Sequence, residues 1–466
     1  MDFSDFKPLR RWMDTPRKFS RMTCMVFLAV TGVLLLSLSY VLLQPSTAFS
    51  PSSSADLNNA EKVNPIVTPS PSPPSPTPEL SSITIHQSEE GTSHVDHSAA
   101  PLAKPAGLRV VGVVFYGRRD RSSLLECYLQ KNLASNGGWL DEVIWAANTD
   151  VPEDMAYGEK IAETAPEYTY LPIKSGGYMG IYLKAFTEPD TIYLKMDDDM
   201  VFIDQSAIPR LVMTLLNNPR ALLVSSNVVN NPALGWVHYH MGAVHPYVPE
   251  VRPVEDSLAT KENGAWRASE LPTWGGADWQ MPELTQFYEL FGVDDRARVP
   301  SHRWIPTRNS SYLYQTPVAQ SQYDAFGPNL QYWPLAAQAH YSLLQNIEEK
   351  RLGRYFMVHG SDEEAVSTWD MRGSRISINF MVIRGSDLID NLANLQGKDD
   401  EDMLTVVLPK QLNRAILVET TSVVAHFSFG PQKNLIKTDI LARYHNYATQ
   451  MICPNSLLEP ETVLAV

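Results

Sequence analysis

The sequence predicts an α/β fold with a mixed sheet and flanking helices, from about residue 107 onward. Residues 108–116, LRVVGVVFY, form a near-continuous apolar and β-branched run, which is typical of a strand buried on both faces. Further strands and helical segments alternate after it: strands at 142–147 and 168–173, helices at 122–133 and 178–186. This alternation predicts a parallel sheet with right-handed crossovers.

The second half predicts more elements of both kinds. Helices are expected at 206–216 and 338–351, and strands at 221–226, 375–383 and 415–425. From about 227 to 339 the pattern dissolves into Pro, Trp, Tyr and His, which predicts a long insert. The insert contains three candidate ligand-binding tryptophans, Trp236, Trp274 and Trp279. They could stack on the apolar faces of sugars or of other ring-shaped acceptors, or they could equally well pack the interior of the insert.

Composition excludes one large class of function. The chain has 466 residues, 44% of them hydrophobic, and a formal net charge of -14. A nucleic-acid binder needs a basic face for the phosphates, and the globular part contains no basic cluster. We therefore expect no nucleic-acid partner.

The N-terminal region predicts a membrane anchor. Residues 22–43 contain no charged residue, and 22 helical residues at about 1.5 Å each span a bilayer core of about 30 Å. Six basic residues precede this run and very few follow it, so residues 1–21 are expected to be cytoplasmic, with type II topology. A cleaved signal peptide is the alternative, but its apolar core would be shorter.

Residues 44–106 are rich in Pro, Ser and Thr and predict a disordered stem between the anchor and a globular domain at 107–466. A sequon at Asn309 is compatible with a glycoprotein exposed to the lumen. Cys127 and Cys453 could form a disulfide there or remain two buried thiols.

Three consecutive carboxylates end the strand that begins at residue 192: Asp197, Asp198 and Asp199. In open α/β sheets ligands bind at strand ends, and buried carboxylates are costly unless something cationic neutralises them. Oxygen ligands favour Mn²⁺ or Mg²⁺, which can also bind a diphosphate. The alternative is a solvated acidic turn, which is common for so short a motif.

Two basic sites are expected at the same edge of the sheet. Arg118 follows the first strand, where a guanidinium group could bind phosphate oxygens, or could simply belong to a solvated turn. Lys174 precedes two glycines at a helix entrance, which is a weaker phosphate signal.

A second acidic cluster, at 398–402, precedes a predicted helix and ends at Asp402. Carboxylates at a helix start are ordinarily a cap and first turn. His426 follows the last predicted strand, where a lone histidine is usually structural.

Together these features resemble the GT-A glycosyltransferases that are anchored in the Golgi membrane as type II proteins. The resemblance rests on the first βαβ unit, the D-x-D of 197–199, the x-E-D of 400–402 and His426. It implies that Asp199 and His426 bind the metal, that Asp197 contacts the nucleotide ribose or the metal, and that Asp402 is the acceptor-side base of an inverting enzyme. With Asp198, Arg118 and Lys174 also assigned to the donor, the expected partners are a nucleotide sugar and a glycan, lipid or small-molecule hydroxyl acceptor.

The expected function is metal-dependent transfer of a sugar from a nucleotide diphosphate, UDP in preference to GDP. A divalent ion would stabilise the departing diphosphate while a carboxylate removes the acceptor proton. One alternative is a catalytically inactive, membrane-anchored glycan-binding or scaffolding protein of the same fold. Another is a metal-dependent hydrolase, in which water is the acceptor.

Overall fold

The structure is a computed structural model. It describes residues 85–87, 93–95, 102–250, 265–274, 281–284, 303–307, 309–357 and 368–454. The expected cytoplasmic tail and anchor, residues 1–43, lie outside these ranges, as does most of the expected stem. Within these ranges, no helix combines the length and the apolar character needed to span a bilayer. In the expected stem, β1 (Ile85–Gln87) and β2 (Ser93–Val95) pair antiparallel.

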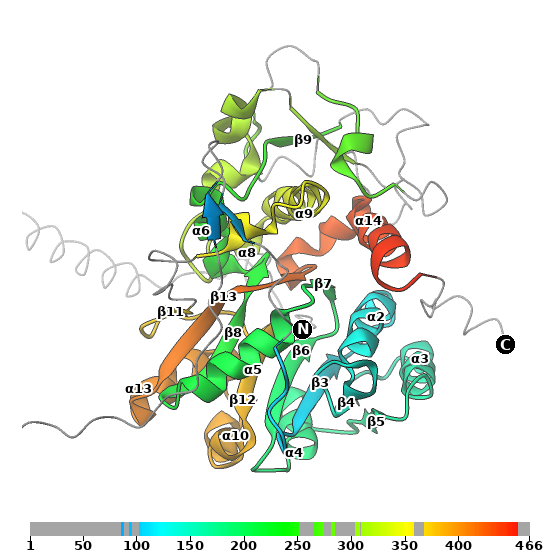
Figure 1. The fold of residues 1–466 in the computed structure, drawn as a ribbon, viewed down its shortest axis with the longest axis vertical. Helices are drawn as coiled ribbons and strands as arrows, with labels where there is room; N and C mark the ends of the chain where they lie inside the picture. Colours follow the sequence, from blue (N-terminus) through cyan, green and yellow to red (C-terminus); the bar gives the residue numbers. More distant parts are fainter. Residues whose placement is uncertain are drawn as a thin grey trace, which may run out of the picture. The chain divides into compact units, whose positions relative to one another are not determined.

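A nine-stranded mixed sheet forms the centre of the domain, in the order β11-β13-β8-β12-β6-β3-β4-β5, with β7 also paired to β13 (Figure 1). The strands are β3 (Val110–Tyr116), β4 (Glu142–Ala147), β5 (Tyr168–Pro172), β6 (Ile192–Asp197), β7 (Met200–Ile203), β8 (Ala221–Val229), β11 (Thr368–Asp370), β12 (Phe380–Arg384) and β13 (Ala415–His426). The predicted parallel arrangement is confirmed for β6, β3, β4 and β5, and β13 is parallel to β8. Strand β12 runs antiparallel to both of its neighbours, so it makes the sheet mixed.

Helices cover both faces of this sheet. The period-two alternation of each strand supplies two cores: Val114 and Leu194 face one layer of helices, whereas Val113 and Tyr193 face the other. The first layer contains α2 (Ser122–Asn132), α3 (Pro152–Ala162), α5 (Ala207–Asn217), α9 (Trp333–Glu348) and α14 (Ile440–Tyr447). The second contains α4 (Gly177–Ala185), α10 (Gly385–Ile389), α11 (Leu392–Leu395) and α13 (Leu408–Leu412).

The expected insert at 227–339 is more regular than its composition indicates. Its first three residues complete β8, and it includes α6 (Pro232–His240), α8 (Pro328–Gln331) and a pair of antiparallel strands, β9 (Tyr247–Pro249) and β10 (Trp304–Pro306). Asn231 caps α6 by accepting a hydrogen bond from the Ala233 backbone, and Pro232 fits its first turn. Short helical turns complete the domain: η1 (Ala134–Asn136), η4 (Ala268–Glu270), η6 (Ser310–Gln315), η7 (Pro317–Gln320), η8 (Leu352–Tyr355), α12 (Asp400–Asp402), η9 (Met403–Val407), η10 (Gly430–Lys437) and η11 (Ala448–Ile452).

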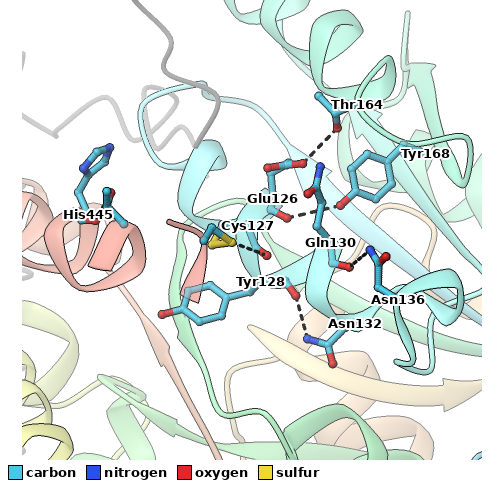
Figure 2. Close-up of a disulfide and its surroundings, with 11 residues drawn as sticks. Glu126, Cys127, Tyr128, Gln130, Asn132, Asn136, Thr164, Tyr168 and His445 are labelled. Atoms are coloured by element: carbon cyan, nitrogen blue, oxygen red, sulfur yellow. Dashed lines mark hydrogen bonds between the residues drawn. A yellow bond between two sulfur atoms is a disulfide. The ribbon is translucent and has the colours of Figure 1, made fainter. Parts of the chain in front are cut away.

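Cys127 on α2 and Cys453 after η11 form a disulfide, with their Cα atoms 6.0 Å apart (Figure 2). Beside it, the buried Glu126 accepts a hydrogen bond from Thr164, and Tyr168 donates to the Glu126 backbone oxygen. The bond therefore joins the helix that follows the first strand of the sheet to the end of the described chain.

Candidate metal centre

The aspartate cluster lies at the C-terminal rim of the sheet. Strand β6 ends at Asp197, beside Phe115 near the end of β3. The chain then turns into β7, where Met200 pairs with His426 at the end of β13. The Phe427 backbone amide donates to the backbone carbonyl oxygen of Asp199 at 2.9 Å. The sheet register thus brings two segments more than 200 residues apart together at one rim.

Asp197, Asp199 and His426 each present one ligand atom, and these atoms lie within 4.8 Å of one another. His426 Nε2 is 2.9 Å from Asp199 Oδ1 and 3.7 Å from Asp197 Oδ2. Asp199 Oδ1 and His426 Nδ1 are buried and have no hydrogen-bond partner of good geometry. In the part of the chain that the structure describes, this is the one group of three such side chains with the spacing to share a metal ion.

Two arginines face Asp199 from the loop after β3. Arg121 Nη1 is 3.2 Å and Arg118 Nη2 is 3.4 Å from Asp199 Oδ2. Burial alone would raise the pKa of Asp199, but His426, Arg118 and Arg121 hold it well below its usual range. Arg121 is itself buried, and its guanidinium group lies 4.5 Å from the centre of the Phe427 ring. Asp199 is therefore a carboxylate that stays ionised in the interior.

Asp197 is held by two neighbours on the opposite side of the cluster. Lys195 Nζ lies 2.5 Å from Asp197 Oδ1 and donates to the Ile378 carbonyl at 2.7 Å. Asn379 donates to Asp197 Oδ2 at 2.9 Å. The protein's own cations thus neutralise much of this cluster, so the charge argument from sequence does not by itself require a metal. The arrangement of three ligand atoms within 4.8 Å of one another is what fits a metal ion.

Asp198 shares Arg118 with Asp199 but does not contact His426. Its Oδ2 accepts from the Gly117 and Arg118 amides at 2.8 and 2.9 Å, and its Oδ1 accepts from Arg118 Nη2 at 2.6 Å. The Asp198 side chain is 5% exposed, whereas the Arg118 side chain is 44% exposed. Asp198 therefore orients a half-exposed arginine at the rim. Lys174 follows the parallel strand β5 at the same rim and is exposed.

An irregular segment connects this centre to the second acidic cluster. The predicted strand at 375–383 is shorter than expected, because β12 begins at Phe380. The side chains before it still alternate: Ile376 and Ile378 enter the core, whereas Arg375 and Asn379 make polar contacts. The polar contacts of Arg375 and Asn379 thus link the two acidic clusters through one short segment.

The carboxylates of the second acidic cluster make different contacts. Asp399 is the N-cap, since it accepts from the Asp402 amide at 2.9 Å. Asp399 and Glu401 both accept from Arg375, whereas Asp400 accepts from the Tyr182 hydroxyl at 2.9 Å. The Asp402 side chain is 45% exposed and lies 3.7 Å from Arg375 Nη1. The helix-capping role thus belongs to Asp399, and the Asp402 carboxylate is accessible.

The three predicted acceptor tryptophans lie in different settings. Trp236 lies on α6, is 37% exposed and packs against His240 at a ring separation of 4.2 Å. Trp274 is half-buried against the core that contains Val114 and Leu194, and it forms an isolated β-bridge with Thr307. Trp279 lies outside the described residues.

The histidines of the insert make separate contacts. His238 forms a hydrogen bond with Asn227 and His245 forms one with Asn346, and burial lowers the pKa of His238 to about 3.

Sequence reasoning overlooked three residues of the rim: Arg121, Lys195 and Asn379. Lys195 carried a readable signal, since it lies two residues before Asp197 and period-two alternation puts both on one face of the strand.

No family model matches the chain, and no curated protein matches it. Among solved structures it is similar to glucosyl-3-phosphoglycerate synthase from Mycobacterium tuberculosis, solved with Mn²⁺, uridine diphosphate and glucosyl-3-phosphoglycerate. The identity is 17%, the TM-score is 0.20, and the match covers 26% of this chain and 44% of that chain. This chain thus spans less than half of the protein to which it is similar.

Proposed function

We propose that the protein is a metal-dependent glycosyltransferase that moves a sugar from a nucleotide diphosphate, UDP in preference to GDP, onto an acceptor hydroxyl. The observation that carries this proposal is the ligand set Asp197, Asp199 and His426 at the C-terminal rim of the sheet, with Arg118 beside it. Ligands bind at this rim in open α/β sheets.

The donor atoms fit a hard to borderline divalent cation. Two carboxylates suit Mn²⁺ and Mg²⁺, and the imidazole favours Mn²⁺, because Mg²⁺ prefers an all-oxygen shell. A bound ion would supply positive charge to stabilise a departing diphosphate.

The remaining residues divide between the two substrates. Arg118 is held by Asp198 yet half-exposed, so its free donors can bind phosphate oxygens, and Lys174 can approach from the end of β5. Asp402 is proposed as the base that accepts the proton of the acceptor hydroxyl, which favours inversion. Its exposure and its freedom from the capping role support that assignment.

The test is metal-dependent nucleotide binding and donor turnover by the full-length protein. We expect UDP to bind in the presence of Mn²⁺ and to be released by excess EDTA, and a panel of UDP-sugars to show slow Mn²⁺-dependent hydrolysis. Nucleotide binding that is equally tight in EDTA would overturn the metal bridge. Binding without any turnover would favour the inactive glycan-binding alternative, and hydrolysis that no acceptor diverts into transfer would favour a hydrolase.

We further propose that the catalytic domain lies in the Golgi lumen behind a single type II anchor at residues 22–43. Two observations support this location: disulfides such as Cys127–Cys453 persist in oxidising compartments, and the sequon residue Asn309 is exposed. Protease added to intact vesicles should leave the domain protected and trim the N-terminal tail. Digestion of the domain without detergent would refute this topology.

A further inference from the structure

Exposed aromatic side chains gather on one part of the described surface. Four large aromatic residues in the described part are strongly exposed, and three of these, Trp236, Tyr323 and Phe326, lie close to one another in sequence or space. Tyr323 lies between two tryptophans: its ring centre is 6.2 Å from that of Trp236, at an interplanar angle of 69°, and 6.5 Å from that of Trp369 on β11, at 19°. Trp369 is half-buried and packs against the core that contains Val113 and Tyr193. We call Trp236, Tyr323 and Trp369 the aromatic track.

The track is bordered by polar groups. His240 packs against Trp236, the exposed Asp370 follows Trp369, and Arg375 lies 4.8 Å over the ring of Phe326. Flat aromatic faces beside carboxylate and guanidinium groups suit a ligand that is apolar on its ring faces and hydroxylated at its edges, which describes a carbohydrate. A lipid would require exposed aliphatic side chains, and none of the large exposed aliphatic residues of the described chain is a sequence neighbour of a track residue: Leu102, Val151, Leu183, Leu412, Ile436 and Met451.

Hydrogen bonds connect the N-cap of α6, the helix that carries Trp236, to the metal centre. The α6 N-cap, Asn231, donates to Asn379 at 3.4 Å, and Asn379 donates to Asp197 at 2.9 Å. Trp236 is five residues further along α6, which is about 7.5 Å of helix rise. Trp236 therefore lies on the helix whose N-cap belongs to the hydrogen-bond network of the metal centre, and Tyr323 joins Trp236 to Trp369.

We propose that the aromatic track binds an acceptor oligosaccharide, with the reacting end toward the metal centre and the distal sugars on Tyr323 and Trp369. The two ring-to-ring steps are comparable to the length of a monosaccharide unit, so the track requires an acceptor longer than one sugar. This inference rests on the proposed function, because it assigns the acceptor side of the same site.

The test measures oligosaccharide binding without the donor. Full-length protein, in a detergent that has no sugar head group, is titrated by calorimetry with linear oligosaccharides of graded length built from glucose, N-acetylglucosamine or mannose. We expect one of these series to bind, and affinity to rise with length until the track is filled. Trp236→Ala, Tyr323→Ala and Trp369→Ala should each weaken binding about 5- to 10-fold, and Trp236→Phe should restore most of the loss.

Tyr314→Ala is the matched control, because Tyr314 is an exposed aromatic residue, 63% accessible, that is not part of the track. It should leave binding unchanged, and thermal unfolding should show that every variant is folded. No binding by any series, or equal weakening by Tyr314→Ala, would overturn the inference, as would binding of lipid vesicles or of an unglycosylated peptide that competes for the same residues. Mn²⁺-dependent UDP binding is measured in parallel. Its absence alongside intact track-dependent glycan binding would refute the transferase and leave the track as a glycan-binding surface.

Discussion

Asp198 and Asp199 are adjacent and buried, and both contact Arg118, but only Asp199 also contacts His426, which permits a sharp test of the metal centre. We compare Asp199→Asn with Asp198→Asn, because Asn keeps the shape of the side chain and removes only its charge. Asp199 contributes a ligand oxygen beside His426, whereas all the hydrogen bonds of Asp198 go to Gly117 and Arg118.

The two variants are expected to differ clearly in their affinity for Mn²⁺, whereas stability is not the property that distinguishes them. Changes in residues that only support metal ligands cost about 10- to 100-fold in affinity, so loss of the ligating charge at Asp199 should cost at least about 100-fold, or 2.7 kcal/mol. Asp198→Asn should leave Mn²⁺ affinity within a few-fold of wild type. Its carbonyl oxygen can still accept from the two amides, so the lost charged hydrogen bond to Arg118 should lower the free energy of unfolding by about 1.5–3 kcal/mol.

The assay is a titration of the full-length protein with Mn²⁺, in which electron paramagnetic resonance measures the concentration of the free ion. Chemical denaturation of each variant measures its stability. Equal losses of Mn²⁺ affinity in both variants would show that the total charge of the cluster, and not the placement of Asp199, attracts the ion. If Asp199→Asn binds Mn²⁺ as tightly as the wild type, the assignment of a metal centre to this rim is wrong.

Three further outcomes are expected. Asp402→Asn should reduce transfer about 10²- to 10⁴-fold with donor binding intact, while Asp400→Asn reduces it less; single-turnover transfer decides, and near wild-type turnover in Asp402→Asn would remove the proposed base. Burial raises the pKa of Glu419 to about 7, so the protonated form stabilises the fold below about pH 4.5 and that stabilisation is lost as pH rises through about 7. The loss is about 3 kcal/mol, and denaturant unfolding from about pH 5 to about pH 8 should show a shallower decline in Glu419→Gln; an unchanged slope would mean another group titrates. Replacing Cys127 and Cys453 with Ser should lower the free energy of unfolding by about 2–5 kcal/mol, measured by denaturant unfolding of full-length protein, whereas unchanged stability would mean that the bond closes no costly loop.

The sequence was most informative where periodicity and burial coincide. The apolar runs that became β3, β6 and β13 are buried along nearly their whole length, so their residue types specified both the strand and its central place in the sheet. The reversed direction of β12 left no such signal, because alternation is the same in parallel and antiparallel strands. The helix α6 was missed because its aromatic residues have only moderate helix propensity, and its start depended on a cap at Asn231.

At the site, sequence reasoning selected residue types but not their orientations. The sequence cannot distinguish Asp197, Asp198 and Asp199, because they are three consecutive residues of the same type. The turn into β7 directs Asp197 and Asp199 toward His426 and directs Asp198 toward Arg118. Tyr323 and Trp369 carried no signal, because they become neighbours only through contacts between α6, the loop before α8 and the sheet edge.

The pairing of β13 with β8 fixes a distance. Trp369 pairs with Val418, which pairs with Ser225 of β8, and at the rim Ala425, just before His426, pairs with Val229. Ser225 and Val229 are four residues apart, about 13 Å along a continuous strand that pairs with β13 at both of these residues. If the aromatic track binds the acceptor as proposed, acceptors too short to reach from the transfer point to Trp369 would be used poorly and all longer acceptors would be used alike. A fixed length of strand in the sheet would then set the shortest acceptor that is used well.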